Sequence, residues 1–277
     1  MRLPEIHCRN YTENAQRNNP FLKGNAMKHT LYGKAELFVF ASREEMGRRA
    51  ASDAADCLRT LLAARKEVNV IFASAPSQNE LLAALVAEPS IAWDRVNAFH
   101  MDEYVGLPHG DSRLFSSYLT KTIFGKLPFK TVNLMNGQSD AREECSRYSS
   151  LLRECPPDIV CMGIGENGHI AFNDPSVADF EDTELVKPVM LEESCRRQQV
   201  NDGCFATLAD VPTTAITMTI PVLIQAKNMF CVVPGARKAD ALRAAMTGPE
   251  SESCPASIMR RHEGARIYAD TDAGGEL

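Results

Sequence analysis

The sequence predicts an α/β protein, a three-layer α/β/α fold built on a mostly parallel, Rossmann-like central sheet. From residue 27 onward, short apolar runs alternate with longer amphipathic segments, which is the pattern of stacked βαβ units. The chain has 277 residues, enough to bury a core without disulfides or metals. With 44% hydrophobic and 24% charged residues, it has the composition of an ordinary soluble globular protein.

The individual elements follow one another in βα order. A first strand is expected over 36–40, and residues 43–65 then carry apolar side chains at helical spacing. Later strands are expected over 68–73, 96–100, 158–162, 213–218, 229–233 and 265–269. Later helices are expected over 78–87, 113–124, 140–154, 220–226 and 236–246. Residues 176–210 are less periodic and rich in Asp, Glu, Arg and Gln, so we expect an irregular or mobile excursion there.

The same patterning indicates one folded domain over 27–277. Residues 1–26 are polar, contain Pro20, and precede an internal Met27 at which the patterned segments begin. We therefore expect residues 1–26 to be a poorly ordered N-terminal extension.

Charge, hydropathy and cysteine usage exclude several classes of function. The net charge of −6 argues against a nucleic-acid or anionic-membrane partner, because both require clustered Lys and Arg. No apolar run reaches the length of a membrane span, and the N-terminus lacks the apolar core of a signal peptide. The nine cysteines are scattered and never form a C-x-x-C pair, which disfavours disulfides and structural zinc. A cytoplasmic protein without a bound metal is expected.

Candidate site residues follow the expected strands. Ligands of open parallel sheets bind beyond the carboxyl ends of the strands. Four segments lie at such ends, namely 73–78, 101–108, 163–175 and 234–238. We expect them to converge on one site.

The segment 163–175 carries the strongest chemical signal. Three glycines directly follow a strand, so the backbone there, including Gly165, can approach a ligand closely. His169 comes next, with Asn167 and Asp174 flanking it, and a histidine near a carboxylate can carry protons near neutral pH. On spacing alone, a tight turn with a structural histidine is an equally good interpretation.

The segment 101–108 supplies two adjacent carboxylates. Adjacent residues of an extended chain point to opposite sides, so only one of Asp102 and Glu103 can face a given pocket. Asp102 is the candidate general base, while Glu103 is a candidate to orient a neighbour, contact the substrate or cap a helix. A solvated acidic turn is the alternative.

The remaining two segments are candidates for binding an anion. Ser74, Ser77 and Gln78 follow a strand and open a helix, where hydroxyls and free N–H groups can hold a phosphate. Ser77 as a plain helix cap is an equally natural interpretation. Lys238 follows another strand and offers a point charge, although such lysines are often simply solvated.

Two of these segments, taken together, resemble the signatures of the glucosamine-6-phosphate deaminase/isomerase family. The resemblance rests on 99–108 and 163–175, extends to 133–137 and 235–242, and covers about residue 35 to the C-terminus. It implies the α/β/α fold and the conversion of glucosamine 6-phosphate and water to fructose 6-phosphate and ammonia. No redox cofactor is implied. The labels isomerase, deaminase and hydrolase are therefore expected to apply.

The resemblance also implies roles for individual residues. Asp102 matches the base that moves a proton between C2 and C1, and His169 matches the group that assists ring opening. Asp174 matches the carboxylate partner of that histidine, and Lys238 matches a phosphate-binding lysine. The family's phosphate-binding arginine has no clear counterpart. Arg197, or else its neighbour Arg196, is the candidate.

Departures from the family pattern leave the substrate open. Asn167 and Asp174 stand where many members have Asp and Glu, and 74–78 replaces a loop resembling Thr-Gly-Gly-Thr-Pro. Galactosamine 6-phosphate or another hexosamine phosphate is thus an alternative substrate. A 6-phosphogluconolactonase is disfavoured, because 168–173 lacks that family's Gly-His-Thr-Ala-Ser-like run. A non-catalytic sugar-phosphate sensor is disfavoured by Asp102 and His169. A homo-oligomer remains an open alternative to a monomer.

Overall fold

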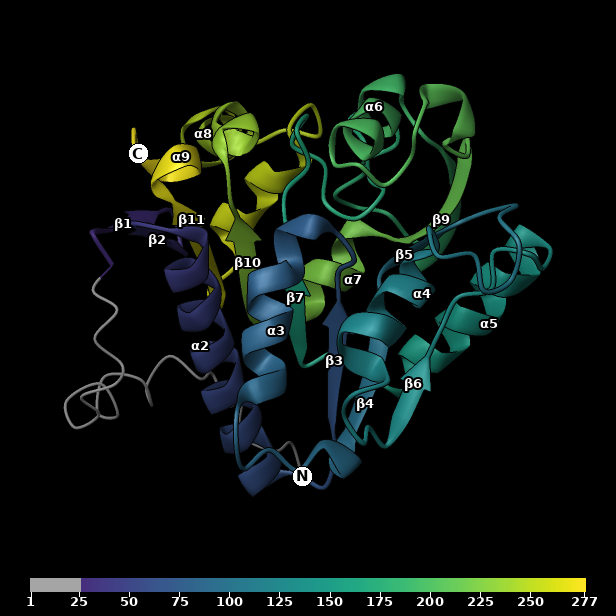
Figure 1. The fold of residues 1–277 in the computed structure, drawn as a ribbon, viewed down its shortest axis with the longest axis horizontal. Coiled ribbons are helices and arrows are strands. Elements are labelled where there is room, and N and C mark those ends of the chain that lie inside the picture. The colour runs from purple at the N-terminus through teal and green to yellow at the C-terminus, as the bar shows by residue number, and fades with distance from the viewer. Residues whose placement is uncertain (1–25) are drawn as a thin grey trace.

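The computed structural model describes residues 26–277, which form a helix-covered sheet (Figure 1). The main sheet has eight strands in the order β1-β2-β11-β10-β7-β3-β4-β6, and all neighbours are parallel except β1 and β2. In that order the strands are Lys28–Tyr32, Ala35–Phe40, Ala265–Asp270, Asn228–Val233, Ile159–Met162, Val68–Phe72, Val96–His100 and Thr131–Asn133. The three-layer α/β fold expected from the sequence is confirmed.

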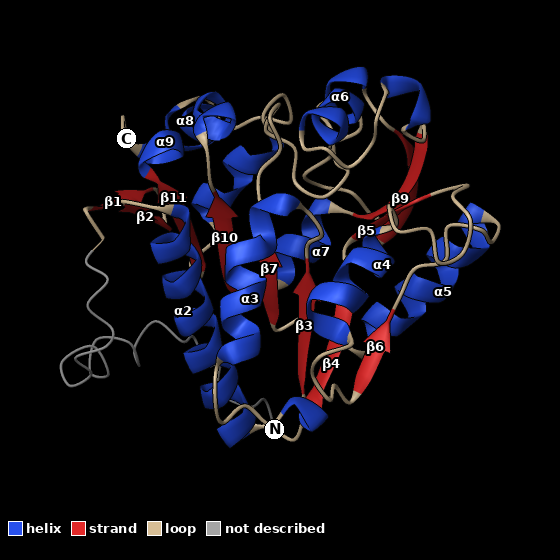
Figure 2. Cartoon of the chain, viewed as in Figure 1, coloured by secondary structure: helices blue, strands red, loops and turns tan. Residues whose placement is uncertain are grey.

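Helices connect the strands and cover both faces of this sheet, as Figure 2 shows in blue and red. The α-helices are α2 (Arg43–Ala64), α3 (Asn79–Ala87), α4 (Phe115–Leu119), α5 (Ala141–Glu154), α6 (Glu193–Asn201), α7 (Ile220–Gln225), α8 (Ala239–Thr247) and α9 (Thr271–Gly274). A π-helical turn, Thr120–Phe124, extends α4, and short 3₁₀ turns include Pro76–Gln78, Ala236–Lys238 and Pro255–Arg261. The helices expected from the sequence are all present, within a few residues of their predicted bounds.

The buried strands carry apolar side chains on both faces, as a sheet between two helix layers requires. Val70 and Phe72 of β3 pack in the cluster under α2 and α3, whereas Ile71 packs in the cluster on the opposite face, with α5 and α7. The alternation along β10 follows the same rule. One hydrophobic core therefore packs against each face of the sheet.

A second, three-stranded antiparallel sheet lies beside the main one, in the order β5-β9-β8. Its strands are Asp102–Tyr104, Thr214–Met218 and Val186–Met190. The expected irregular excursion over 176–210 is therefore wrong in part, because it contains β8 and α6. The strand expected near 213–218 exists as β9, but it belongs to this sheet and pairs antiparallel with both neighbours.

Other differences concern short elements at the edges. The sequence did not predict β1, which forms an antiparallel hairpin with β2, or the three-residue strand β6. The extension expected over residues 1–26 lies outside the described residues, apart from Ala26. Within residues 26–277, no helix combines the length and apolar character that crossing a bilayer requires.

Candidate active site

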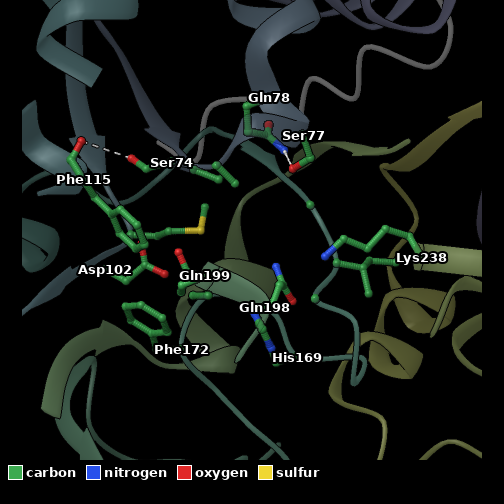
Figure 3. Close-up of a pocket in the computed structure, with 17 residues that line it drawn as sticks. Ser74, Ser77, Gln78, Asp102, Phe115, His169, Phe172, Gln198, Gln199 and Lys238 are labelled. Carbon is green, nitrogen blue, oxygen red and sulfur yellow. Dashed lines mark hydrogen bonds between the residues drawn. The ribbon is translucent and has the colours of Figure 1, made fainter. Parts of the chain in front are cut away.

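One cavity lies at the carboxyl ends of the four central strands β3, β4, β7 and β10 (Figure 3). Its empty volume, including the part open to solvent, is about 470 Å³, which suits a small-molecule ligand. All four segments singled out in the sequence contribute to its wall. The cavity lies where the chain reverses its course across the sheet, since β3 leads toward β4 and β6 while β7 leads toward β10 and β11.

Asp102 enters the cavity where the chain passes from the main sheet into the second sheet. β4 ends at His100, and Asp102 begins β5, paired with Thr217 of β9. The side chain is only 6% exposed. Burial raises the pKa of Asp102 well above the ordinary aspartate range, and the nearby Glu103 raises it further. A carboxylate in such a place is a strong proton acceptor.

The glycine turn after β7 brings His169 against the cavity. The Gly165 N–H donates to the His169 carbonyl oxygen at 2.9 Å, and Gly168 takes a φ of +84°, a conformation that suits glycine. A Cβ atom added to Gly165 would lie 2.2 to 2.4 Å from three atoms of the His169 imidazole. Glycine at position 165 is therefore required for the observed position of the imidazole.

Asn167 and Asp174 hold that imidazole from behind. Its Nδ1 lies 2.7 Å from Asn167 Oδ1 and 3.3 Å from Asp174 Oδ1, and Asn167 Nδ2 donates to Asp174 Oδ1 at 2.9 Å. Burial raises the pKa of Asp174, but the hydrogen bonds and charge of His169, with smaller contributions from Asn167 and the Glu192 N–H, leave it below the ordinary value. Asp174 is therefore a buried carboxylate that orients and stabilises the histidine.

The second sheet anchors the chain between His169 and Asp174. The Phe172 N–H donates to Thr217 Oγ1 at 3.1 Å, and Asn173 Nδ2 donates to the Met218 carbonyl oxygen at 2.9 Å. Ala171, which lines the cavity, has a φ of +49°, a strained conformation for a residue with a Cβ atom. Since Asp102 pairs with Thr217, strand β9 fixes the base and the histidine segment relative to each other.

The other end of the cavity is suited to an anion. Ser77, Gln78 and Lys238 line it, and Gln78 Nε2 donates to Ser77 Oγ at 3.3 Å. Ser74 also lines the cavity, but its Oγ donates to the Phe115 carbonyl oxygen at 3.3 Å and lies toward the Asp102 end (Figure 3). Lys238 is the sole cationic side chain among the described residues of the wall. Burial lowers its pKa, while the carboxylates of Asp202 and Glu166 act in the opposite direction.

Two residues expected to bind substrate lie elsewhere. Glu103 is fully buried and accepts hydrogen bonds from three backbone N–H groups, those of Tyr104, Phe115 and Ser116, at 2.9 to 3.0 Å. Its side chain points away from the cavity and caps the start of α4. Arg197 is exposed and pairs with Glu193 one helical turn earlier, so it does not reach the wall. The expectation of substrate contact is wrong for both residues in this structure.

Three wall residues, Phe115, Gln198 and Gln199, lie outside the four segments predicted from the sequence. The two glutamines come from α6, in a segment whose polar composition hid the helix. Gln198 and Gln199 directly follow Arg196 and Arg197, the candidates for phosphate binding, so the correct part of the chain was under consideration. Nothing in the residue spacing, however, placed α6 over the cavity. Phe115 stacks on Phe172 with ring centroids 5.4 Å apart, so the two rings form an apolar wall.

One group of residues near the cavity has the composition of a metal site. His169, Asp174 and Cys195 are buried, and their ligand atoms lie within 4.8 Å of one another. The imidazole Nδ1 already lies at hydrogen-bonding distance from Asn167. The hydrogen bonds and the ion pair already described engage His169 and Asp174 within the protein.

Known proteins resemble this chain in sequence and in fold. Residues 41–268 match the family model described as glucosamine-6-phosphate isomerases/6-phosphogluconolactonase. A protein of Bacillus cereus (strain B4264), named glucosamine-6-phosphate deaminase, is 42% identical over 180 residues, 65% of this chain and 67% of its own length. A Bacillus thuringiensis (strain Al Hakam) protein of the same name is 41% identical, with the same coverage.

Solved structures agree with this result. A structure described as a monomeric glucosamine-6-phosphate deaminase superposes with a TM-score of 0.78 at 27% identity, covering 86% of this chain and 98% of that one. The 6-phosphogluconolactonase of Trypanosoma brucei gives a TM-score of 0.72 at 14% identity, covering 90% of this chain and 100% of that one, and thus shares the fold.

These findings correct one expectation and establish another. The label hydrolase is wrong, because the relatives at 41–42% identity are named deaminases. The family expected from 99–108 and 163–175 is confirmed, since the matched region spans nearly all the elements that build the cavity. The chain belongs to the glucosamine-6-phosphate isomerase/6-phosphogluconolactonase family.

Proposed function

We propose that this protein is an enzyme that converts glucosamine 6-phosphate to fructose 6-phosphate and ammonia. The observation that carries the proposal is the placement of a buried carboxylate, Asp102, and a carboxylate-supported imidazole, His169, in the wall of one cavity. The names of the relatives at 41–42% identity support the same substrate.

The first step is opening of the sugar ring. His169 moves a proton between the C1 hydroxyl and the ring oxygen, which breaks the C1–O5 bond and leaves an aldehyde at C1. Asp174 and Asn167 hold the imidazole in place during this transfer. Opening is required because a C2 proton becomes removable only when it lies next to a carbonyl group.

The second step is proton transfer between two carbon atoms. Asp102 accepts the C2 proton, giving an enolate that carries the amino group at C2, and returns the proton to C1. One proton of the amino nitrogen passes to O1, so that C1 becomes an alcohol and the C–N bond becomes an imine. C1 is thereby reduced and C2 oxidised within the same molecule, so this step needs no external redox cofactor. Water then adds to the resulting imine at C2, the C–N bond breaks, and ammonia leaves. The raised pKa of Asp102 suits a group that must both accept and return a proton.

The phosphate group is assigned to the opposite end of the cavity. Lys238 supplies a positive charge there, and Ser77 and Gln78 supply neutral polar groups. A substrate held at both ends has C1 and C2 close to Asp102. We place the enzyme in the cytoplasm, as the free cysteines found among the described residues favour, and its assembly into a homo-oligomer stays a prediction.

A substrate panel tests the proposal. The purified protein is incubated with glucosamine 6-phosphate, galactosamine 6-phosphate and 6-phosphogluconolactone, and the release of ammonia, ketose phosphate and acid is measured. We expect ammonia and fructose 6-phosphate from glucosamine 6-phosphate and much slower reaction with the other two compounds. Absence of ammonia from both amino sugars would contradict the proposal.

A further inference from the structure

The Gln199 side chain is a buried amide in the cavity wall without a partner. Gln199 is 7% exposed, and its side-chain amide makes no hydrogen bond with any residue in the described part of the chain. In Figure 3 it points into the cavity at the end that contains Asp102 and Phe172. The amide faces the cavity and has no protein partner in the described residues, so it has capacity for a ligand.

The preceding residue shows what a structural glutamine does in the same helix. Gln198 Oε1 accepts the Glu166 N–H at 2.8 Å, and its Nε2 donates to Asp202 Oδ2 at 3.4 Å. Gln198 therefore ties α6 to the glycine turn, and both ends of its amide are engaged. Gln199 has no such task, although it is buried to nearly the same extent.

We infer that Gln199 is a specificity-determining residue that hydrogen-bonds a substrate oxygen next to the reacting carbons. This inference rests on the proposed function, which places C1 and C2 of an open-chain sugar beside Asp102. An amide offers both a donor and an acceptor, so it can pair with a hydroxyl or a carbonyl oxygen. The apolar Phe115 and Phe172 rings line this end of the cavity, and the nearby Ser74 hydroxyl already donates to the Phe115 carbonyl oxygen.

The role follows from the arrangement of charges in the wall. Lys238, Ser77 and Gln78 can hold the phosphate end of a sugar phosphate, but contacts at one end alone leave the rest of the chain free to turn. Gln199, contacting the other end, gives a second fixed point and so aligns the C2 proton with Asp102. A site built to hydrogen-bond an oxygen also rejects analogues that lack it, because its own polar group is then left unpaired.

The first test replaces the amide with an apolar group of similar length. We expect Gln199→Met to lower kcat/KM for glucosamine 6-phosphate by about 10- to 100-fold, the usual effect of losing a hydrogen bond in a desolvated site. Arg197→Ala is the matched control, since Arg197 lies in the same helix but is exposed and pairs only with Glu193 among the described residues. It should leave kcat/KM within about twofold of the unmodified protein.

A second variant tests whether the side chain of residue 199 lies at the Asp102 end of the cavity. Gln199→Glu places another carboxylate at the Asp102 end of the cavity, which disfavours ionisation of Asp102. The acidic limb of the pH profile of kcat/KM should therefore shift to higher pH. If Gln199→Met fails to fold, an unmoved limb in Gln199→Glu still contradicts the inference.

The outcomes separate the two claims. An unmodified protein that releases no ammonia contradicts the proposed function, and the inference with it. An active unmodified protein with Gln199→Met within about twofold of its kcat/KM, or with an unmoved acidic limb in Gln199→Glu, contradicts the inference alone and leaves the proposed function standing.

Discussion

At the scale of single residues, the site depends on where its carboxylates lie. Asp102 and Glu103 are adjacent in sequence, yet one faces the cavity and the other faces the backbone of α4. The alternation of side chains in an extended strand produces this division. It also places a second negative charge near Asp102, which adds to the effect of burial on the pKa of Asp102.

The raised pKa of Asp102 predicts the pH dependence of the reaction. Asp102 must be ionised to accept a proton, so kcat/KM should fall as the pH falls through the raised pKa. That fall should lie at a clearly higher pH than the ordinary aspartate value of 3.8. A pH profile of kcat/KM measures it, with protein stability checked at each pH. An acidic limb at or below about pH 4 contradicts the assignment.

Gly165 gives a second prediction at this scale. In Gly165→Ala the new methyl group occupies the place of the His169 imidazole, which Asn167 and Asp174 hold in position. We expect kcat to fall by about 10-fold or more through the displaced general acid–base group. Overpacking should also cost about 1 to 3 kcal/mol in the free energy of unfolding. Unchanged kcat, measured together with thermal unfolding, is the opposing result.

Site residues that follow an expected strand could be identified from the sequence. Asp102, His169 and Lys238 each lie in the segment after an expected strand, so their presence at one sheet edge was predictable, and the structure brings them into one cavity. Arg197 was not predictable in this way. Its direction depends on the rotation of α6, which no local pattern fixed.

At the scale of elements, Glu103 is the cap that positions α4. Glu103→Gln removes the negative charge of the carboxylate that accepts hydrogen bonds from three backbone N–H groups. We expect this change to lower the free energy of unfolding by about 1 to 3 kcal/mol. The same change removes a negative charge beside Asp102 and should move the acidic limb of the pH profile to lower pH. Chemical denaturation and the pH profile measure the two effects.

A remote cap supplies the control for that variant. Ser42 Oγ accepts the Glu45 N–H at 3.2 Å at the start of α2, away from the cavity wall. Ser42→Ala should cost about 1 kcal/mol without moving the pH profile. If both variants shift the profile equally, the effect of Glu103→Gln arises from general destabilisation.

Elements with a clear periodicity of apolar residues were predictable from the sequence, and elements without one were not. The strand β4 and the helix α5 matched their expected bounds closely, because β4 is fully buried and Asp140 caps α5. The helix α6 is mostly polar and buries only Cys195, Gln198 and Gln199, so its pattern resembles a loop. In β8, Pro188 and the exposed Met190 obscured the strand.

At the scale of the whole molecule, each of the two sheets positions a different part of the site. The main sheet brings four strand ends to one edge, and the second sheet links Asp102 to the segment that carries His169. The parallel sheet was predictable from alternating βα segments. The second sheet was not, because its three strands are short and come from distant parts of the chain.

The most direct measurement follows the proton that Asp102 is assigned to move. Glucosamine 6-phosphate is converted in D₂O by the unmodified protein and by Asp102→Asn, and deuterium at C1 of the fructose 6-phosphate is measured by NMR together with ammonia. The unmodified protein should release ammonia and place solvent deuterium at C1, whereas Asp102→Asn should lose about 10²- to 10⁴-fold in rate. Ammonia release and deuterium incorporation by Asp102→Asn at the unmodified rate would contradict the account.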